Sequence, residues 1–507
     1  MKVVKGMDDL KKILDLIDYE IEKLEEKNEG ENAIHNFKDF MIYDSQGRWH
    51  TAKHLDLITS KLQQVSEDTA KGIPHRLIIT LPPRHGKSEV VSKKFPAWHL
   101  GRNPEHEIVL SSYSADLAYD HSRIARNTLL SHSELFGISI AKDSAAVGRW
   151  GLEGHRGGLF AAGVGGPITG RGMHIGIIDD PFKNAEEANS ETIREKVWNW
   201  YTTTFYTRLA PGGSIIILMT RWHEDDLVGR LLEREKEDIQ KGLDIISWEA
   251  INLPAIAEES DPLERLPGEA LWPERFPIET LRETKRTLGS YWFDALYQQR
   301  PAPAEGNKFK RRWFRYFEEM DDYYILHTPE GNVTIPKDKC WRFQTADTAS
   351  SEKQSSDYTV LTDWIVTPNN DLLVDDVFRD RIEVPEQEKV FQQRYYEKKP
   401  LFQAIETKNT GIALKQYLIR KGLPIKELKA DVDKVSRAAT IMVIYENGKV
   451  YHRKNSYWLE EWESELVTFP TGKYDDQVDT AAYAGIVLTQ LRHKGENARP
   501  RGVRRKK

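Results

Sequence analysis

A short loop between two apolar stretches combines the residue types that bind phosphate. LPPRHGKS (81–88) follows the apolar run RLIITL (76–81) and precedes a helix-like stretch. Gly86 lets backbone N–H groups approach a phosphate, Lys87 reaches the outer phosphates of a nucleotide, and Ser88 offers a ligand for Mg²⁺. Leu81 stands where the usual pattern has a glycine. We predict that the following residues bind ATP: Arg84, His85, Gly86, Lys87 and Ser88.

Two adjacent carboxylates end the apolar run HIGIIDD (174–180). An enzyme that hydrolyses ATP needs one carboxylate to hold the Mg²⁺ shell and another to position or deprotonate the attacking water. We assign the first role to Asp179 and the second to Asp180. The alternative for Asp180 is that it caps the segment that follows, DPFKN.

A third apolar run, SIIILMT (214–220), ends in a polar residue. Thr220 is placed to sense the γ-phosphate, or it is an ordinary threonine at the end of a strand. Two arginines are candidates for neutralising charge in the transition state. Arg84 would act within the chain, and Arg171, in the glycine-rich loop 163–174, would act on the ATP of a neighbouring subunit. Either arginine can instead be a surface residue.

A second set of acids lies in the C-terminal half. Asp347 ends the run FQTADT, Glu406 ends FQAIET, and DDQVD (475–479) opens a helix-like stretch. Asp476 and Asp479 are three residues apart and share one helix face. Acids from two strands and a helix can hold two Mg²⁺ or Mn²⁺ ions, which activate water and stabilise the leaving oxygen of a phosphodiester. Asp475 and Asp357 are weaker candidates.

Two cations stand close to these acids in sequence. Lys434 and Arg437, in DKVSR (433–437), either contact the phosphates of DNA or form a solvated charge pair.

The elements that position these residues follow from hydrophobic patterning. Short apolar runs alternate with helix-like segments from residue 76 to 220, which predicts a parallel sheet covered on both faces. The stretch 299–311 is rich in Pro, Gly and charge and is predicted to be a linker. A second α/β pattern starts at Cys340. Residues 8–28 place apolar side chains at spacings of three and four, which predicts an amphipathic helix.

Composition narrows the class of protein. The chain has 507 residues, a net charge of -6 and 39% hydrophobic residues, which is typical of a globular protein with two to four domains. Its one cysteine cannot form an internal disulfide, so we expect a reducing compartment. The N-terminus lacks an apolar signal region, and no apolar run is long enough to span a bilayer. Residues 494–507 carry seven Lys or Arg against one Glu and are predicted to form a basic, disordered tail.

Taken together, these motifs resemble the large terminase subunit of tailed bacteriophages. The resemblance covers roughly residues 45–485 and rests on motifs in the family's order, which are LPPRHGKS, VGGPITGRG, IIDDP, TRWHEDDL, QQRPAPAEG, ADTAS, AIETKNTG, DKVSRA and YDDQVDTAAYA. It implies an α/β protein with an N-terminal P-loop NTPase (a RecA/ASCE-like parallel sheet) and a C-terminal RNase H-like nuclease domain. By the same resemblance, Thr220 lies in the coupling motif, and the nuclease acids are Asp347, Glu406 and Asp479.

The resemblance also implies a function and its partners. ATP hydrolysis would drive double-stranded DNA into a procapsid, and the nuclease would cut concatemeric DNA. The expected partners are DNA, the portal or procapsid, the small terminase subunit, and further copies of this chain in a ring, without a membrane. The protein would act in the cytoplasm of the infected host and not remain in the mature virion.

We expect five segments along the chain: a helical arm (1–44), the ATPase (45–300), a linker or lid (301–338), the nuclease (339–493) and the tail (494–507). Two other functions stay open. One is an ATP-dependent DNA remodeller or helicase whose RNase H-like domain binds DNA without cutting it. The other is an assembly subunit that binds ATP but scarcely hydrolyses it.

Overall fold

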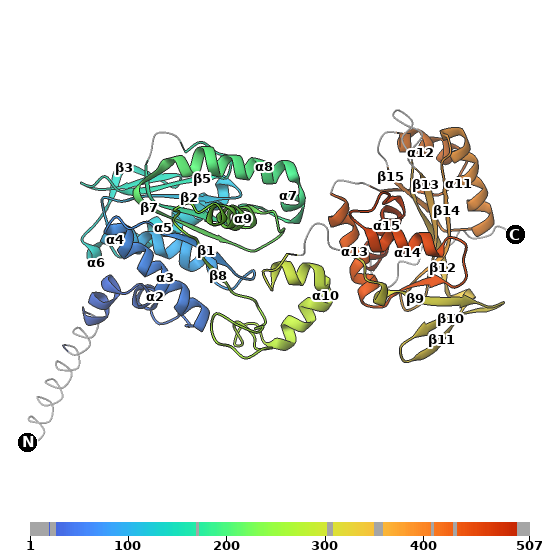
Figure 1. Ribbon diagram of the computed structural model, residues 1–507, viewed down its shortest axis with the longest axis horizontal. Helices are drawn as coiled ribbons and strands as arrows, with labels where there is room; N and C mark the ends of the chain where they lie inside the picture. Colours follow the sequence, from blue (N-terminus) through green and yellow to red (C-terminus); the bar gives the residue numbers. More distant parts are fainter. Residues whose placement is uncertain are drawn as a thin grey trace, which may run out of the picture. The chain divides into compact units, whose positions relative to one another are not determined.

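The computed structural model of the chain describes Glu20 and residues 27–168, 172–301, 308–348, 358–406, 410–428 and 433–493. The predicted helix at 8–28 lies almost wholly outside these residues, and so does the predicted tail. The structure divides into two compact units. The first comprises Met1–Leu281 and Asp294–Pro301, and the second comprises Arg282–Phe293 and Ala302–Lys507. Figure 1 shows the elements of each unit.

The first unit is built on an eight-stranded sheet in the order β3-β4-β5-β2-β6-β7-β1-β8. The pairs from β5 to β8 are parallel, as predicted, whereas β3, β4 and β5 pair antiparallel at one edge. The strands are β1 (Arg76–Thr80), β2 (Glu107–Ser112), β3 (Ile140–Ala146), β4 (Arg149–Leu152), β5 (Gly158–Gly163), β6 (Met173–Asp179), β7 (Leu209–Met219) and β8 (Glu249–Asn252).

Helices cover both faces of this sheet (Figure 1). Strand residues alternate between two cores, so that Leu77 and Ile79 join one core while Ile78 joins the other. The first core is closed by α2 (Phe37–Asp44), α3 (Lys53–Ala70), the π-helix η1 (Glu89–Lys94), α4 (Phe95–Arg102) and α5 (Ala115–Ser131). The second is closed by α8 (Glu191–Trp200), the π-helix η2 (Tyr201–Phe205) and α9 (Leu227–Gln240). The short helices α6 (Ser133–Phe136), η3 (Tyr206–Arg208) and α7 (Ala185–Asn189) complete the unit.

The second unit has a nine-stranded mixed sheet in the order β11-β10-β9-β17-β14-β13-β12-β15-β16. Its centre is an antiparallel run, β14-β13-β12, that continues with β15 and β16 in parallel. The strands are β9 (Arg315–Glu319), β10 (Tyr323–Thr328), β11 (Gly331–Pro336), β12 (Trp341–Asp347), β13 (Thr359–Val366), β14 (Leu372–Asp380), β15 (Gln403–Glu406), β16 (Ile425–Leu428) and β17 (Val450–Arg453).

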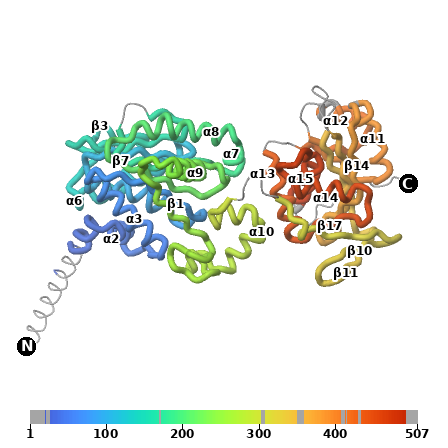
Figure 2. The backbone as a smooth tube through the Cα atoms, in the orientation of Figure 1, coloured from blue at the N-terminus to red at the C-terminus, as the bar shows by residue number. Residues whose placement is uncertain are grey.

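Helices cover this sheet as well. One face packs against α13 (Lys434–Glu446), α14 (Leu459–Thr468) and α15 (Asp476–His493), and the other packs against α11 (Val384–Lys398) and α12 (Thr410–Arg420). Two short turns, η4 (Arg311–Trp313) and η5 (Lys337–Lys339), flank the hairpin strands. Figure 2 traces the path of the backbone through both units.

The structure differs from two of the predicted segment boundaries. Within the predicted linker or lid (301–338), β9, β10 and β11 form the end of the second sheet. Their alternating polar and apolar residues follow a Pro- and Gly-rich stretch that obscured the strand pattern. In the predicted arm (1–44), Phe37, Phe40 and Met41 of α2 lie in the core of the first unit.

Helix α10 (Ile278–Leu296) belongs to both units, since residues 282–293 cluster with the second and 294–301 with the first. It bends at Gly289, whose φ of 73° lies in the left-handed region that favours glycine. Among the described residues, no helix has the length and apolar character that crossing a membrane requires.

Candidate functional sites

The first candidate site forms where three neighbouring parallel strands end. The order β6-β7-β1 places Asp179, the last residue of β6, beside Leu218, and places Thr80 beside Met219. The loop 81–88 follows β1 and Thr220 follows β7, so the predicted motifs meet at one edge of the sheet. Ligands of open α/β sheets bind at the carboxyl ends of the strands, which is where these residues lie.

Lys87 is the centre of this site. Its side chain is buried, with a relative exposure of 7%. The ammonium Nζ lies 2.5 Å from Thr220 Oγ1 and 2.9 Å from Asp180 Oδ2. The structure therefore brings together three residues that the sequence analysis assigned to one site from separate motifs.

Asp179 is held by hydroxyl groups from the phosphate loop and the helix that follows it. Ser88 Oγ donates to Oδ1 at 3.1 Å, and Ser92 Oγ donates to Oδ2 at 2.7 Å. Burial, together with the neighbouring Asp180 carboxylate, raises the pKa of Asp179 to about 7. Excess negative charge next to a serine hydroxyl suits a divalent cation, which would relieve the cost of burying the carboxylate.

Asp180 takes a left-handed conformation with φ of 45°, which turns its side chain towards the end of β7. Its Oδ1 accepts from the backbone N–H of Thr220 at 2.9 Å. In the structure, both carboxylate oxygens thus have partners, one on Lys87 and one on Thr220. Asp180 links the loop to the strand end rather than capping the segment after it.

The phosphate loop depends on a glycine. Gly86 has φ of 89°, and a Cβ atom there would meet Leu55 Cδ2 at 3.0 Å, so any other residue would be both strained and crowded. The His85 ring is buried and stacks on Phe276 with centroids 4.4 Å apart. Burial lowers the pKa of His85 to about 4, so the ring is neutral at pH 7 and supports the loop by packing.

Only one of the two candidate arginines lies among the described residues. Arg84 is exposed at the tip of the loop, with φ of 62°. Arg171 lies outside the described residues, as does Asp357.

The second candidate site forms on the second sheet. Asp347 and Glu406 end β12 and β15, which are parallel neighbours, so the two carboxylates stand at the same edge. Helix α15 begins at Asp476 and crosses this edge. Its first turn is fixed by Thr480, whose carbonyl accepts from Thr345 Oγ1 and whose hydroxyl lies 2.8 Å from Thr362 Oγ1.

Two cations of α13 pair with these acids. Arg437 Nη2 lies 2.8 Å from Asp479 Oδ1, and its Nη1 lies 3.7 Å from Glu406 Oε2. Lys434 Nζ lies 2.6 Å from Asp475 Oδ1 and 3.2 Å from Asp479 Oδ2. Lys434 and Arg437 therefore contact the acids themselves and are not a solvated charge pair.

The acids of this site outnumber the two cations, and the excess negative charge helps to raise the pKa values of two of the acids. Burial and the charges of Asp479, Asp476 and Glu406 raise the pKa of Asp347 well above its ordinary value. Burial and the nearby Glu465 raise the pKa of Asp476 to about 6. The donor set and the excess negative charge suit a divalent cation. As they stand, however, no three His, Cys, Asp or Glu side chains among the described residues are arranged to hold a metal ion.

Three residues that contact the predicted site residues were not predicted from the sequence. Ser92 binds Asp179 from one turn beyond the motif. His121, on α5, brings Nδ1 to 3.3 Å from Asp179 Oδ2. Tyr483 donates its hydroxyl to Glu406 and receives a hydrogen bond from Arg437 Nη1 at 3.2 Å. Tyr483 had a signal, because it lies four residues after Asp479 on the same helix face.

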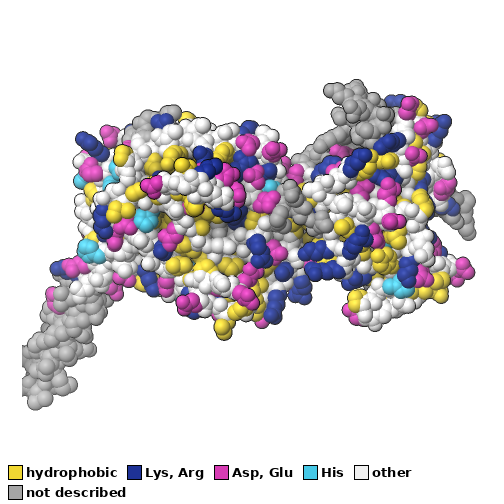
Figure 3. All heavy atoms as spheres, in the orientation of Figure 1, with side chains coloured by type: hydrophobic (Ala, Val, Ile, Leu, Met, Phe, Trp, Pro, Cys, Tyr) yellow, Lys and Arg dark blue, Asp and Glu magenta, His cyan; other side chains and the backbone are white. Residues whose placement is uncertain are grey.

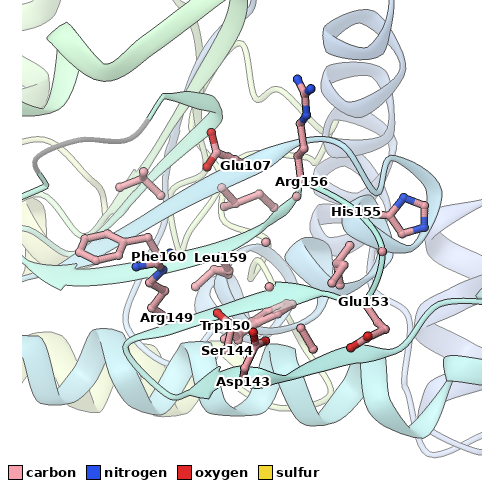
Figure 4. A pocket seen from close by; sticks show the side chains of 18 of the residues that line it. Glu107, Asp143, Ser144, Arg149, Trp150, Glu153, His155, Arg156, Leu159 and Phe160 are labelled. Atoms are coloured by element: carbon pink, nitrogen blue, oxygen red, sulfur yellow. The ribbon is translucent and has the colours of Figure 1, made fainter.

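A further cavity lies elsewhere in the first unit, at the antiparallel edge of the sheet (Figure 4). It has a volume of about 360 Å³ and is lined by β2 to β5 and the turn between β4 and β5, with polar side chains such as Asp143, Arg149 and Arg156. Its lining contains none of the predicted site residues that the structure describes.

Comparisons with known proteins match both halves of the chain. A family model described as "Terminase large subunit, T4likevirus-type, N-terminal" matches residues 78–316. A second, described as "Terminase RNaseH-like domain", matches residues 344–486. The large terminase subunit of Enterobacteria phage T3 is 26% identical over 247 residues, which are 45% of this chain and 41% of that protein. The match thus spans about two fifths of the length of that relative.

Solved structures are similar at lower identity. The large terminase of a thermophilic bacteriophage in complex with ADP is 11% identical, with a TM-score of 0.42, over 81% of this chain and 93% of that one. The HK97 bacteriophage large terminase is 12% identical, with a TM-score of 0.32, over 84% and 94% of the two chains.

Proposed function

Because the chain belongs to the family of terminase large subunits, with an N-terminal P-loop ATPase fold and a C-terminal RNase H-like fold, we propose that it is a subunit of a viral DNA-packaging motor. It hydrolyses ATP to move double-stranded DNA into a procapsid and cuts concatemeric DNA. The observation that carries the proposal is the meeting of Lys87, Asp180 and Thr220 at the ends of adjacent strands.

The first unit supplies the residues for ATP hydrolysis. Gly86 opens the loop to the phosphates, and Lys87 neutralises their charge. Ser88 and Asp179 would hold Mg²⁺, which neutralises charge on the bridging and terminal oxygens when bound. Once Lys87 turns from Asp180 to a phosphate, one carboxylate oxygen of Asp180 becomes available to orient the attacking water.

Thr220 accepts a hydrogen bond from Lys87, so a movement of that lysine would change the contacts at the end of β7. Arg84, at the exposed tip of the loop, would neutralise charge that develops on the γ-phosphate, and Arg171 remains the alternative from a neighbouring subunit.

The second unit supplies the residues for DNA cleavage. Asp347, Glu406, Asp476 and Asp479 would hold Mg²⁺ or Mn²⁺, which lowers the pKa of bound water when present. Arg437 pairs with both Asp479 and Glu406, and Tyr483 donates to Glu406, so these two side chains orient the acids. Lys434, which is half exposed, can leave the acids to contact a DNA phosphate.

The partners proposed for the motor follow from the family. They are double-stranded DNA, the portal or procapsid, the small terminase subunit, and further copies of this chain in a ring in the cytoplasm of the infected host. Both Lys and Arg side chains and Asp and Glu side chains lie on the surface of each unit (Figure 3). A motor that slides along DNA must hold the phosphates weakly, because many tight phosphate contacts would raise the affinity for DNA.

ATP hydrolysis by Lys87→Ala tests the assignment of the first site. The rate is expected to fall by roughly 100-fold or more, since the ammonium that stabilises phosphate charge is lost. Lys71→Ala is the control, because Lys71 is an exposed lysine of the same unit that pairs with Asp68 and precedes β1, whereas the phosphate loop follows that strand. Full ATPase activity in Lys87→Ala would remove the basis of the proposal.

A further inference from the structure

A short segment of the first unit lies between two crossings of the chain to the second unit. Residues Asp294–Pro301, here called the return segment, belong to the first unit, whereas residues 282–293 before them and the described residues from 308 onwards cluster with the second. The return segment is therefore joined by the chain to the second unit at both of its ends, so a displacement of the segment would pull on the chain that leads to that unit. What the return segment contacts in the first unit decides what can displace it.

Gln299 joins the return segment to the coupling motif. Its Oε1 accepts from the backbone N–H of Arg221 at 3.0 Å, and Arg221 directly follows Thr220. The Gln299 side chain is buried at 3% exposure, and its Nε2 donates to the carbonyl of Leu296. The residue has φ of 55°, so the backbone bends here to bring the side chain to the strand end.

The return segment also lies near the phosphate loop. Burial raises the pKa of Tyr297, and the charge of Arg84 opposes that rise, so the loop arginine acts on the segment electrostatically. The contact between the segment and the ATP site is therefore the hydrogen bond of Gln299 at the end of β7, and Tyr297 lies within electrostatic range of the loop arginine.

The preceding residue, Gln298, is buried to a similar degree but contacts a different part of the unit. Its Oε1 accepts from the N–H of Ile256 at 3.0 Å, and its Nε2 donates to the carbonyl of Ile256 at 2.9 Å. Gln298 therefore anchors the segment to the loop that follows β8 rather than to the end of β7. Gln298 thus anchors the segment, whereas Gln299 contacts the nucleotide site.

We propose that Gln299 is a positioning residue that couples the nucleotide site to the chain leading to the second unit. When Lys87 moves between Asp180 and a phosphate, Thr220 loses or regains its partner, and the Arg221 N–H moves with it. The buried amide oxygen of Gln299 is costly to leave without a donor, so the Gln299 side chain follows the N–H, and with it the return segment. The inference rests on the proposed binding of ATP to this site.

Hydrogen exchange of the full chain tests the proposal. Exchange is compared in the presence of saturating ADP and of saturating, slowly hydrolysed ATP analogue, in peptides covering 216–226 and 294–310. In the wild type and in Gln298→Met, we expect the two nucleotides to give different exchange at 294–310. In Gln299→Met, which keeps the side-chain length but removes both polar atoms, that difference is expected to disappear.

Three outcomes are decisive. Equal responses in Gln299→Met and the wild type, or no response in a wild type that binds nucleotide, would overturn the coupling role and leave the ATPase assignment intact. A wild type that binds neither nucleotide would contradict the proposed function and the coupling role with it. If Gln299→Met does not fold, a nucleotide titration of the wild type tests the proposal instead. The coupling role requires hydrogen exchange in peptides 216–226 and 294–310 to change at the same nucleotide concentration, and changes at different concentrations would overturn it.

Discussion

Most residues of the two candidate sites could be predicted from short motifs, because each motif reports a local turn or strand end. Asp179 and Thr220 were each placed at the end of an apolar run and Lys87 in the loop that follows one, and the structure brings them together. Ser92 could not be predicted in the same way, and the spacing of Tyr483 from Asp479 indicated only that the two residues share a helix face. Their contacts with Asp179 and Glu406 depend on how a helix lies against a strand that is distant in sequence, which no local pattern encodes.

Tyr483 leads to a prediction for DNA cleavage. Tyr483→Phe removes the hydroxyl that Glu406 accepts, so the carboxylate is no longer held beside Arg437. Loss of a residue that orients a metal ligand typically weakens metal affinity, and we expect the Mn²⁺ concentration for half-maximal cleavage to rise by about 10-fold. A manganese titration of plasmid cleavage measures this.

Tyr445→Phe is the control, since it deletes another buried tyrosine hydroxyl of the same unit, one that pairs with His452. An unchanged manganese requirement in Tyr483→Phe would show that Glu406 is held without the tyrosine.

His85 leads to a prediction about pH. Its pKa is lowered by burial to about 4 in the folded protein, against 6.5 ordinarily, so below pH 6.5 only the unfolded chain takes up this proton. The free energy of unfolding must therefore fall as the pH falls from 6.5 to about 4, by roughly 3 kcal/mol for this residue.

His85→Gln should lose less stability over the same pH range than the wild type. Denaturant unfolding at pH 7 and at about pH 4.5 measures the difference. The same loss of stability in both proteins would mean that His85 is not held neutral by the fold.

At the scale of elements, the parallel part of the first sheet could be predicted because buried parallel strands are apolar almost throughout. The antiparallel edge was harder to predict, since β3 (IAKDSAA) is mostly exposed and mixes alanines with polar residues such as Lys142 and Asp143, without the alternation that marks a strand. In the second unit, β12, β13 and β14 coincide with apolar runs of the sequence. Strands β9 to β11 come after a Pro-rich stretch that indicated a linker.

The placement of α15 leads to a prediction about stability. Thr480→Val leaves the buried hydroxyl of Thr362 without its partner, which is expected to cost roughly 1–3 kcal/mol in the free energy of unfolding. The double variant Thr480→Val, Thr362→Val replaces both partners with apolar groups and should recover most of that loss. Thermal unfolding of the three proteins measures it. A double variant less stable than the single would show that the two hydroxyls do not act as a pair.

At the scale of the whole molecule, a net charge of -6, taken alone, disfavours a nucleic-acid partner. The structure shows how part of the acidity is used, because the carboxylates of Asp347, Glu406 and residues 475, 476 and 479 converge around Lys434 and Arg437 in the second unit. In the first unit, Asp179 and Asp180 lie beside Lys87 in a separate site. Two sites in two units predict two activities that can be lost independently.

The central claim is that one chain both hydrolyses ATP and cuts DNA, and the cutting activity tests it most directly. Plasmid cleavage with Mn²⁺ is measured for the wild type, Asp347→Asn, Lys87→Ala and the control Asp380→Asn, which changes an exposed carboxylate at the end of β14. We predict cleavage by the wild type, Lys87→Ala and Asp380→Asn, and none by Asp347→Asn. A wild type that hydrolyses ATP but never cuts, or an Asp347→Asn that cuts as fast as the wild type, would contradict the account and favour a remodeller that only binds DNA.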